Sequence, residues 1–330
     1  MSQDRKKDHI ELAGASQTKT SSNHGLVYEP MLSGFKDAQD LSIEWAGKKL
    51  KYPLWISSMT GGTEKAGPIN ANLARAAGKS GIGMGLGSCR SLIDSDQRLE
   101  DFKARKYIGD GVLFANLGIA QTERLLASGK TDKITEMVKK LEADGLIIHV
   151  NPLQEYMQPE GDIIQAPPLQ TIKRLIERFK LPLIVKEVGQ GMGPCSLREL
   201  CKLPLEAIEF SAFGGTNFTK LEQTRHKAFN SGKKNELLGF ADIGHSASEM
   251  VEWLNQILEE NDDLPCRKFI ISGGVNSMIT GHSLRSRLNA PSLIGMAKAY
   301  LDKALISSEA VEELIEEQAE ALNLASLYLK

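Results

Sequence analysis

The sequence has few cysteines and no long apolar run, and both absences exclude classes of protein. Its four cysteines, Cys89, Cys195, Cys201 and Cys266, are scattered without C-x-x-C spacing, so neither a disulfide framework nor a zinc site is indicated. No stretch approaches the ~18 consecutive apolar residues of a membrane span. The amino terminus carries basic residues without the apolar run of a signal peptide behind them. We therefore expect a soluble, cytoplasmic protein that works away from membranes.

The sequence also lacks a strong net charge. Forty Lys and Arg residues oppose forty-two Asp and Glu residues, which gives a net charge of −2. This balance excludes binding of nucleic acid through overall charge, although it permits a local basic patch. Hydrophobic residues make up 41% and charged residues 25%, an ordinary globular composition with enough apolar material for a large core. A cytoplasmic enzyme without a nucleic-acid partner is the expected class.

Eight short apolar segments alternate with longer helical patterns along the chain. Near-continuous apolar strands between helices indicate parallel β/α units whose sheet is covered on both faces. Eight such units predict a closed (β/α)8 TIM barrel. A ninth candidate, residues 237–241, is assigned to a long connection after the sixth strand; as a strand it would break the count of eight. The eight segments span residues 53–58, 82–87, 112–116, 146–150, 182–186, 207–211, 268–272 and 292–296.

The helices between these segments can be recognised from their periodicity. Apolar residues at spacings of three and four predict helices over 70–78, 133–143 and 169–179. Ser196, followed three residues later by Glu199, predicts a capped helix start.

The chain divides into a polar, turn-rich beginning and a barrel. We expect an N-terminal arm or cap over residues 1–50 and a single barrel domain over residues 51–330. From about Ser307 onward, an acidic amphipathic helix either completes the barrel or contacts another subunit. Basic residues of the arm, including Arg5 and Lys6, have two interpretations: a solvated mobile tail, or a segment that folds over a polyanionic substrate.

Small residues follow the seventh and eighth predicted strands, where a phosphate could bind. The active site of a β/α barrel lies at the carboxyl ends of its strands. Residues 272–274 read Ser-Gly-Gly, and residues 296–298 read Met-Ala-Lys. Glycine allows backbone N–H groups to approach an oxyanion closely, and the following helix adds a favourable dipole. The alternative is that these glycines only form tight turns.

Other strand ends carry polar residues with two possible readings. Lys186 ends a buried apolar strand, where a lysine is costly unless it is paired or used. An ion pair with Glu187 is the alternative, although alternation points neighbouring residues to opposite faces. His149 is either a functional residue or a satisfied core histidine. Gln154 and Glu155, taken alone, would be ordinary solvated loop residues.

Eight motifs occur in order and together resemble those of a known family. The set is similar to type 2 isopentenyl-diphosphate isomerase, the flavin-dependent form, from residue 5 to about residue 299. Ser-Gly-Gly is common to many flavin barrels, whereas the motif from His149 to Glu155 with the Arg-Lys head is far more specific. The motifs are Arg5-Lys6-x-x-His9, Met59-Thr60-Gly61-Gly62, Gly87-Ser88, Asn116-Leu117-Gly118, His149-Val150-Asn151-Pro152-Leu153-Gln154-Glu155, Val185-Lys186-Glu187-Val188-Gly189, Gly214-Gly215-Thr216 and Ser272-Gly273-Gly274-Val275.

The resemblance implies a β/α barrel that binds FMN and interconverts isopentenyl and dimethylallyl diphosphate. It implies a flavin reduced by NADPH or NADH, Mg²⁺ at the diphosphate, and a homo-oligomer, a tetramer or octamer. The implied flavin-binding residues are Ser58, Met59, Thr60, Ser88, Asn116, Lys186, Ser211 and Thr216, with Gly273, Gly274, Ala297 and Lys298 at the FMN phosphate. The implied substrate-binding residues are Arg5, Lys6, His9, Arg90 and Gln154, with His149 and Gln154 catalytic and Glu155 holding Mg²⁺.

Physical chemistry is consistent with these implied roles. Lys186 near the pyrimidine end of the ring would stabilise anionic reduced flavin. A single carboxylate such as Glu155 is a plausible protein ligand for Mg²⁺, which also takes phosphate oxygens and water. Moving a double bond requires adding one proton and removing another. No side-chain pair is an obvious acid–base couple for an unactivated alkene, so reduced flavin N5 is the expected proton carrier.

Two alternatives stay open. An FMN-dependent oxidoreductase of the hydroxy-acid oxidase or dihydroorotate dehydrogenase type would share Lys186 and the phosphate turns. It would not explain Arg5-Lys6 together with Gln154-Glu155, and a hydroxy-acid oxidase would need a His–Arg pair late in the barrel. The other alternative is a phosphate-binding barrel without catalytic activity.

Overall fold

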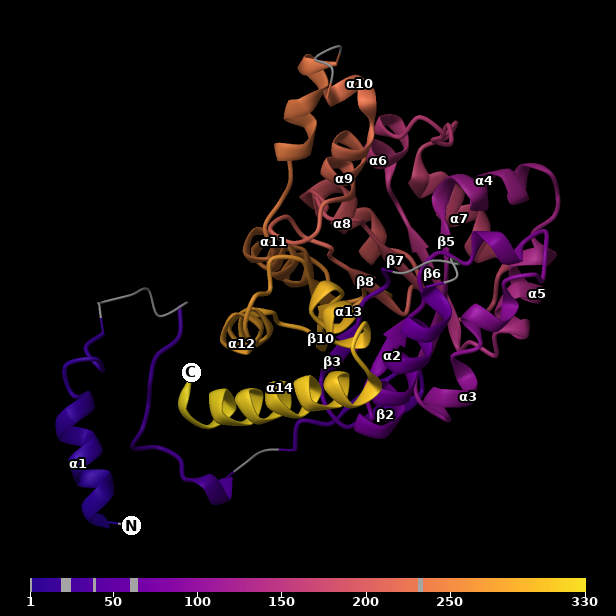
Figure 1. Ribbon diagram of the computed structural model, residues 1–330. Helices are drawn as coiled ribbons and strands as arrows, with labels where there is room; N and C mark the ends of the chain where they lie inside the picture. The colour runs from indigo at the N-terminus through magenta and orange to yellow at the C-terminus, as the bar shows by residue number, and fades with distance from the viewer. Residues whose placement is uncertain (1, 19–24, 38–39, 60–64, 231–233) are drawn as a thin grey trace.

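Eight parallel strands form the centre of the protein. The computed structural model describes residues 2–18, 25–37, 40–59, 65–230 and 234–330. The strands are β3 (Leu54–Ile56), β4 (Gly83–Gly85), β5 (Leu113–Gly118), β6 (Gly145–His149), β7 (Leu183–Lys186), β8 (Ala207–Glu209), β9 (Phe269–Ser272) and β10 (Ser292–Met296). They close into a barrel in the order β10-β3-β4-β5-β6-β7-β8-β9 (Figure 1). Each overlaps one of the eight predicted segments, so the predicted TIM barrel is confirmed.

Helices surround this barrel, and further helices lie near its carboxyl end (Figure 1). The surrounding helices are α2 (Ala66–Ser80), α3 (Arg105–Ile108), α4 (Ile119–Ala127), α5 (Asp132–Lys140), α7 (Pro168–Arg178), α8 (Pro194–Cys201), α11 (Ala247–Glu260), α12 (Met278–Arg287), α13 (Lys298–Ala304) and α14 (Ser308–Tyr328). Three further helices, α6 (Pro152–Met157), α9 (Phe218–Arg225) and α10 (Lys227–Asn230), group together near the carboxyl end of β7 (Figure 1). Helix α14 packs against α2, α12 and α13, which supports its predicted role in completing the barrel. Among the described residues, no helix is both long enough and apolar enough to cross a bilayer.

Two local predictions have different outcomes. Residues 237–241 lie in a 3-10 helix, Asn235–Asp242, between β8 and α11, so their assignment to a connection is confirmed. The predicted helix start at Ser196 is wrong, because α8 begins at Pro194 with Gly193 as its N-cap. Proline has no N–H to leave unpaired and its fixed φ suits the first helical turn, so the helix starts two residues earlier.

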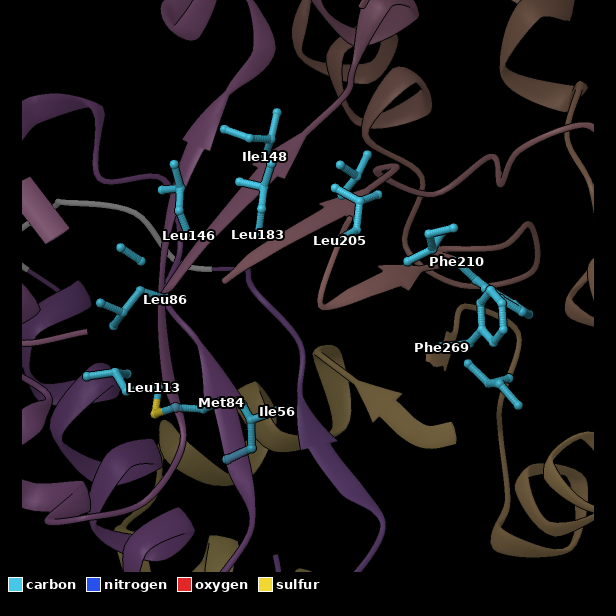
Figure 2. Packing of buried hydrophobic residues seen from close by; sticks show 14 of the residues in the cluster. Ile56, Met84, Leu86, Leu113, Leu146, Ile148, Leu183, Leu205, Phe210 and Phe269 are labelled. Carbon is cyan, nitrogen blue, oxygen red and sulfur yellow. The ribbon is translucent and has the colours of Figure 1, made fainter. Parts of the chain in front are cut away.

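Alternation along the strands separates two cores. Residues such as Leu146, Ile148 and Val185 face outward and pack with residues of the surrounding helices in the larger cluster, part of which Figure 2 shows. Inward-facing residues form a smaller cluster inside the barrel. Its members are Trp45, Leu50, Trp55, Val112, Phe114, Ile147, Ile184, Ala207, Ile270 and Leu293. The barrel is therefore filled at its centre, and only the ends of the strands are available for binding.

A hairpin from the predicted arm closes the amino end of the barrel. Strands β1 (Ile43–Trp45) and β2 (Lys48–Leu50) pair in antiparallel fashion, and Trp45 and Leu50 enter the inner cluster. Lys48 Nζ lies 2.6 Å from Asp144 Oδ1, and Asp144 immediately precedes β6. The main-chain N–H of Ala46 donates to Glu206, which precedes β8. The end of the arm thus belongs structurally to the barrel.

Candidate active site

Two adjoining pockets open at the carboxyl ends of the strands. The first, here called the glycine-turn pocket, reaches from β7 to the start of α13 and includes residues 273–274 and 297–298. The second, the histidine pocket, includes Asn116, His149 and Gln154. The two share a wall made by Ser58, Met59, Lys186, Val188 and Phe218.

These pockets gather most of the predicted site residues, which come from the ends of all eight strands and the loops that follow them. Five predicted residues, Arg5, Lys6, His9, Arg90 and Glu155, line neither pocket in this structure, and Thr60 lies outside the described residues. Glu155 follows the pocket-lining Gln154 on α6. The predicted residues that line one or both pockets are Ser58, Met59, Ser88, Asn116, His149, Gln154, Lys186, Ser211, Thr216, Gly273, Gly274, Ala297 and Lys298.

Five inward-facing polar residues form a layer at the carboxyl end of the barrel, and all of them except Glu209 line one or both pockets. We call them the polar row: Asn116, His149, Lys186, Glu209 and Ser272, one from each of the strands β5 to β9. The residue two positions before each belongs to the inner apolar cluster, so alternation turns all five into the barrel. The apolar filling of the barrel therefore ends in a polar layer at its carboxyl end.

His149 is a neutral hydrogen-bonding group in this row. Its Nδ1 lies 2.7 Å from Asn116 Oδ1, and because an amide oxygen only accepts, the hydrogen is assigned to Nδ1. Burial, with a smaller contribution from the Lys186 ammonium, lowers the pKa of His149 to about 3. At neutral pH the imidazole is therefore uncharged, with Nε2 as an acceptor.

Lys186 is directed to the pocket wall and not to a neighbouring carboxylate. Its side chain is buried, and Nζ donates to the main-chain oxygen of Glu187 at 2.6 Å. The Glu187 carboxylate instead accepts main-chain N–H groups of Gly189, Gln190 and Gly191. The alternative, an ion pair between the side chains of Lys186 and Glu187, is therefore not formed in this structure.

The glycine turns bring two loop backbones into contact. A Cβ at Gly273 would lie 2.0 Å from the main-chain oxygen of Ala212, and Gly273 has a φ of +83°. A Cβ at Gly214 would lie 3.2 Å from the Cα of Gly274. Tight turns are thus part of the reason for these glycines. Ser211 adopts a φ of +43°, a conformation that L residues rarely adopt and that often marks a functional site.

Glu155 is held by three donors beside the histidine pocket. Oε1 accepts from Asn151 Nδ2 at 2.9 Å, while Oε2 accepts from Gln158 Nε2 at 3.0 Å and from the main-chain N–H of Asp162 at 2.7 Å. In the ranges that the structure covers, no three His, Cys, Asp or Glu side chains form a metal-binding cluster. These residues fit Mg²⁺ only as a site with one protein carboxylate, completed by phosphate oxygens and water.

Arg90 and the residues of the arm lie away from the pocket walls. Arg90 donates to Asp162, which also accepts from Arg124. Arg5, Lys6 and His9 lie on α1 (Ser2–Leu12), and all three are exposed. Figure 1 shows α1 apart from the barrel, away from α6 and α9 at the carboxyl end. The structure does not bring the arm to the site.

The pocket walls fit a polar ligand with a phosphate end. Ser57 Oγ and Ser58 Oγ are buried, and neither has a hydrogen-bond partner among the described residues. Ser58 faces both pockets, and Ser57 lines the glycine-turn pocket. Two glycine-rich turns and the start of α13 frame one end of that pocket, as an FMN phosphate would require. The residues therefore fit FMN.

Sequence reasoning missed several wall and floor residues. Val188 and Phe218 line both pockets, and Glu209 lies beneath them. A charged residue in the apolar segment 207–211, in phase with Lys186 of the preceding strand, was an available signal for Glu209. Nothing in the sequence marked Phe218, which is the first residue of α9.

Comparisons with known proteins give close relatives in sequence. No protein-family model matches the chain. A protein of Rickettsia felis named isopentenyl-diphosphate delta-isomerase is 33% identical over 330 residues, which cover 98% of this chain and 92% of that protein. A protein of a Nostoc species with the same name is 36% identical over 277 residues, covering 84% of this chain and 75% of the relative.

Solved structures with the same fold are more distant in sequence. A mandelate oxidase variant with an FMN adduct has a TM-score of 0.58 and 14% identity, covering 97% of this chain and 91% of that chain. A flavocytochrome b2 variant with bound sulfite has a TM-score of 0.63 and 15% identity, covering 92% and 72%. These likenesses show the TIM-barrel fold alone. Identity of one third along nearly the whole chain, on a barrel whose strand ends carry the motifs described above, makes this protein a member of the type 2 isopentenyl-diphosphate delta-isomerase family.

Proposed function

We propose that this protein interconverts isopentenyl and dimethylallyl diphosphate in isoprenoid biosynthesis, with reduced FMN and Mg²⁺. One observation carries the proposal: the two pockets share a wall that includes Lys186, Met59 and Phe218. A flavin ring in the glycine-turn pocket would face a small molecule in the histidine pocket. NADPH or NADH is the proposed reductant.

Different parts of the glycine-turn pocket would hold different parts of FMN. Gly273, Gly274, Ala297 and Lys298 lie where the phosphate would bind. Lys298 is exposed and its Nζ lies 2.6 Å from Asp302, so its ammonium would have to leave this ion pair to contact the phosphate directly. The walls toward the ring would be Ser58, Met59, Lys186, Ser211 and Thr216, together with Thr60. Ser88 and Asn116, which line the adjoining histidine pocket, would contact the ring from that side.

The histidine pocket would hold the hydrocarbon and orient the diphosphate outward. Gln154 and neutral His149 line it, and both supply hydrogen bonds without changing charge. Arg90, at the start of a neighbouring 3-10 helix, would reach the diphosphate after leaving Asp162. Arg5, Lys6 and His9 would reach it when the arm folds over the mouth. Glu155 would hold Mg²⁺ through the free lone pair of Oε1.

The chemistry must move a proton to one carbon and remove a proton from another. Gln154 carries no titratable proton, and His149 is neutral with a strongly lowered pKa, so neither is a strong acid at neutral pH. When bound, reduced FMN supplies acid–base chemistry at its ring. The protein's own residues orient the alkene, and Met59, Val188 and Phe218 keep water from the shared wall.

The oxidoreductase alternative receives less support. The described residues that line the two pockets include no arginine, although a hydroxy-acid oxidase would need a His–Arg pair. The oxidases of similar fold are only 14–15% identical, whereas the isomerase-named relatives reach 33–36%.

Location and assembly complete the proposal. We propose a cytoplasmic homo-oligomer, a tetramer or octamer, without a nucleic-acid partner. Support for self-association comes from exposed apolar side chains at the base of the arm: Tyr28, Met31, Leu32 and Phe35 are 66%, 88%, 70% and 79% exposed. Light scattering on the purified protein measures the oligomeric state, and a monomer would contradict this part of the proposal.

The decisive test of the function has two steps. Acid release of the cofactor, followed by chromatography, should recover about one FMN per chain and no FAD. Anaerobic incubation of the reduced protein with isopentenyl diphosphate and Mg²⁺ should then yield dimethylallyl diphosphate. Recovery of FAD or of no flavin, or reduction without isomerisation, would contradict the proposal.

A further inference from the structure

Glu209 is a buried carboxylate that the proposed chemistry does not use. Its side chain is 0% exposed inside the barrel. Oε1 accepts a hydrogen bond from Ser272 Oγ at 3.2 Å, and Oε2 has no hydrogen-bond partner in the described part of the chain. A carboxylate removed from water with one free oxygen is costly unless a positive charge lies close by.

The candidate for that positive charge is Lys186 on the adjacent strand, whose Nζ donates to the main-chain oxygen of Glu187 and forms no direct ion pair with Glu209 among the described residues. Lys186 on β7 and Glu209 on β8 are register partners in the parallel sheet, and both face the barrel interior. Adjacent strands lie about 4.8 Å apart, so the two side chains rise side by side from the same layer. Lys186 lines both pockets, whereas Glu209 lies beneath them and lines neither.

The groups around Lys186 include one other carboxylate, that of Glu187, whose pKa burial raises and the Lys186 ammonium, with a smaller effect, lowers. His149 is the register partner of Lys186 on β6, and the lowered pKa of that imidazole leaves it neutral. The carboxylate of Glu187 accepts main-chain N–H groups of residues 189–191. Asn116 and Ser272 are uncharged. Within the polar row, Lys186 and Glu209 are the two residues of opposite charge.

We propose that Glu209 is a positioning residue that acts through Lys186. Its carboxylate is the counter-charge that holds the Lys186 ammonium in the shared pocket wall and partly offsets its field. Together, Glu209 and Lys186 determine how strongly the pocket stabilises reduced FMN, the more negative form, relative to oxidised FMN. This inference rests on the proposed function, because its effect is measured as the midpoint potential of bound FMN.

The test measures the midpoint potential of the bound flavin in Glu209→Gln. Removing the negative charge leaves Lys186 without its partner in the polar row, so the ratio of reduced, more negative flavin to oxidised flavin should rise about tenfold at a fixed potential. For a two-electron couple this is a rise of about 30 mV. Glu209→Asp keeps the charge, so the ratio of reduced to oxidised flavin should stay within threefold of the wild-type value. Ser272→Ala removes the hydrogen bond to Glu209 without changing a charge, and the ratio should again stay within threefold.

A second background shows whether the effect passes through Lys186. In Lys186→Met the proposed partner of Glu209 is absent, so adding Glu209→Gln should shift the potential by less than it does in the wild-type background. An equal rise in both backgrounds would show that Glu209 acts on the ligand directly and would overturn the inference. An unchanged potential in Glu209→Gln, or an equal rise in Glu209→Asp, would overturn it too.

A flavin-free measurement separates this inference from the proposed function. Infrared difference spectra between wild type and Glu209→Gln, both labelled with ¹³C-glutamate, should show the bands of an ionised carboxylate at Glu209. A protonated Glu209 in wild type would overturn the pair whether or not FMN is bound. An ionised Glu209 in protein that holds no flavin would uphold the pair and reject the proposed function.

Discussion

His149 Nδ1 lies 2.7 Å from Asn116 Oδ1, and this contact orients a neutral imidazole at the floor of the histidine pocket. The two residues come from adjacent strands, β6 and β5, and both face inward. The arrangement fixes which nitrogen can accept a hydrogen bond from a ligand. It also makes the folded state sensitive to acid.

The first prediction concerns that sensitivity. The pKa of His149 is lowered from 6.5 to about 3, mainly by burial, so the unfolded chain binds this proton more readily. The free energy of unfolding should therefore fall as pH falls from about 6.5 toward 3, by up to about 1.4 kcal/mol per pH unit. Urea denaturation of wild type and of His149→Gln at several pH values measures the contribution. Equal pH dependence in the two proteins would contradict the buried, neutral assignment.

The second prediction concerns the arm. Deleting residues 1–18 should leave the melting temperature and flavin content unchanged, because α1 lies apart from the barrel. Isomerisation should fall by at least a hundredfold, since charge-assisted contacts to the diphosphate would be lost.

A pair of point variants refines the arm prediction. Arg5→Ala combined with Lys6→Ala should reproduce the loss. Lys7→Ala is the matched control, because Lys7 is equally part of α1 but lies 3.7 Å from Glu11. An unchanged kcat/KM after deletion would show that the arm is a solvated tail.

The third prediction concerns Glu155. Glu155→Gln keeps size but removes the anionic charge that a hard dication needs, so Mg²⁺ activation should weaken greatly while the flavin spectrum stays normal. Gln154→Ala should lower turnover while Mg²⁺ activation persists, because an amide has no charge to lose. Activity against Mg²⁺ concentration, with reduced flavin held constant, distinguishes the two. If the activity of Glu155→Gln depends on Mg²⁺ concentration as that of wild type does, the assignment of Glu155 as a metal ligand is wrong.

The fourth prediction concerns the hairpin that closes the amino end. Trp45 is fully buried there, so Trp45→Ala should lower the free energy of unfolding by about 3–5 kcal/mol. The flavin content and turnover of the molecules that remain folded should not change, because the pockets lie at the opposite end. The exposed neighbour Glu44→Ala is the control and should change stability by less than about 0.5 kcal/mol. Equal effects of the two changes would mean that Trp45 is not part of the core.

The barrel could be predicted from sequence because each strand is short, apolar and bounded by small residues. Segment 268–272, for example, contains all of β9, and both of its faces are buried. Ser196 shows where local patterns fail: a serine with a glutamate three residues later matches a cap, but the nearby Pro194 starts the helix earlier.

The site was predictable where residue type and strand end coincide, as at Lys186 and His149. Glu209 was missed because a single charge in an apolar segment does not reveal which face it occupies until the strand is placed. The position of α1 could not be predicted, because its residues are exposed and the sequence does not encode a contact for them. Likewise, the three hydrogen bonds to Glu155 depend on the loop up to Asp162, whose path no local pattern defines.

The seam between β3 and β10 has a consequence for how the chain is made. Leu54 pairs with Ile294 there, so the barrel closes through residues that lie far apart in sequence. On a ribosome, β3 leaves the exit tunnel long before β10 exists, and until then its main-chain groups on that side lack their strand partner. Such an exposed edge can pair with another nascent chain. Slow synthesis between these two strands would therefore lengthen the period during which the growing polypeptide depends on chaperones.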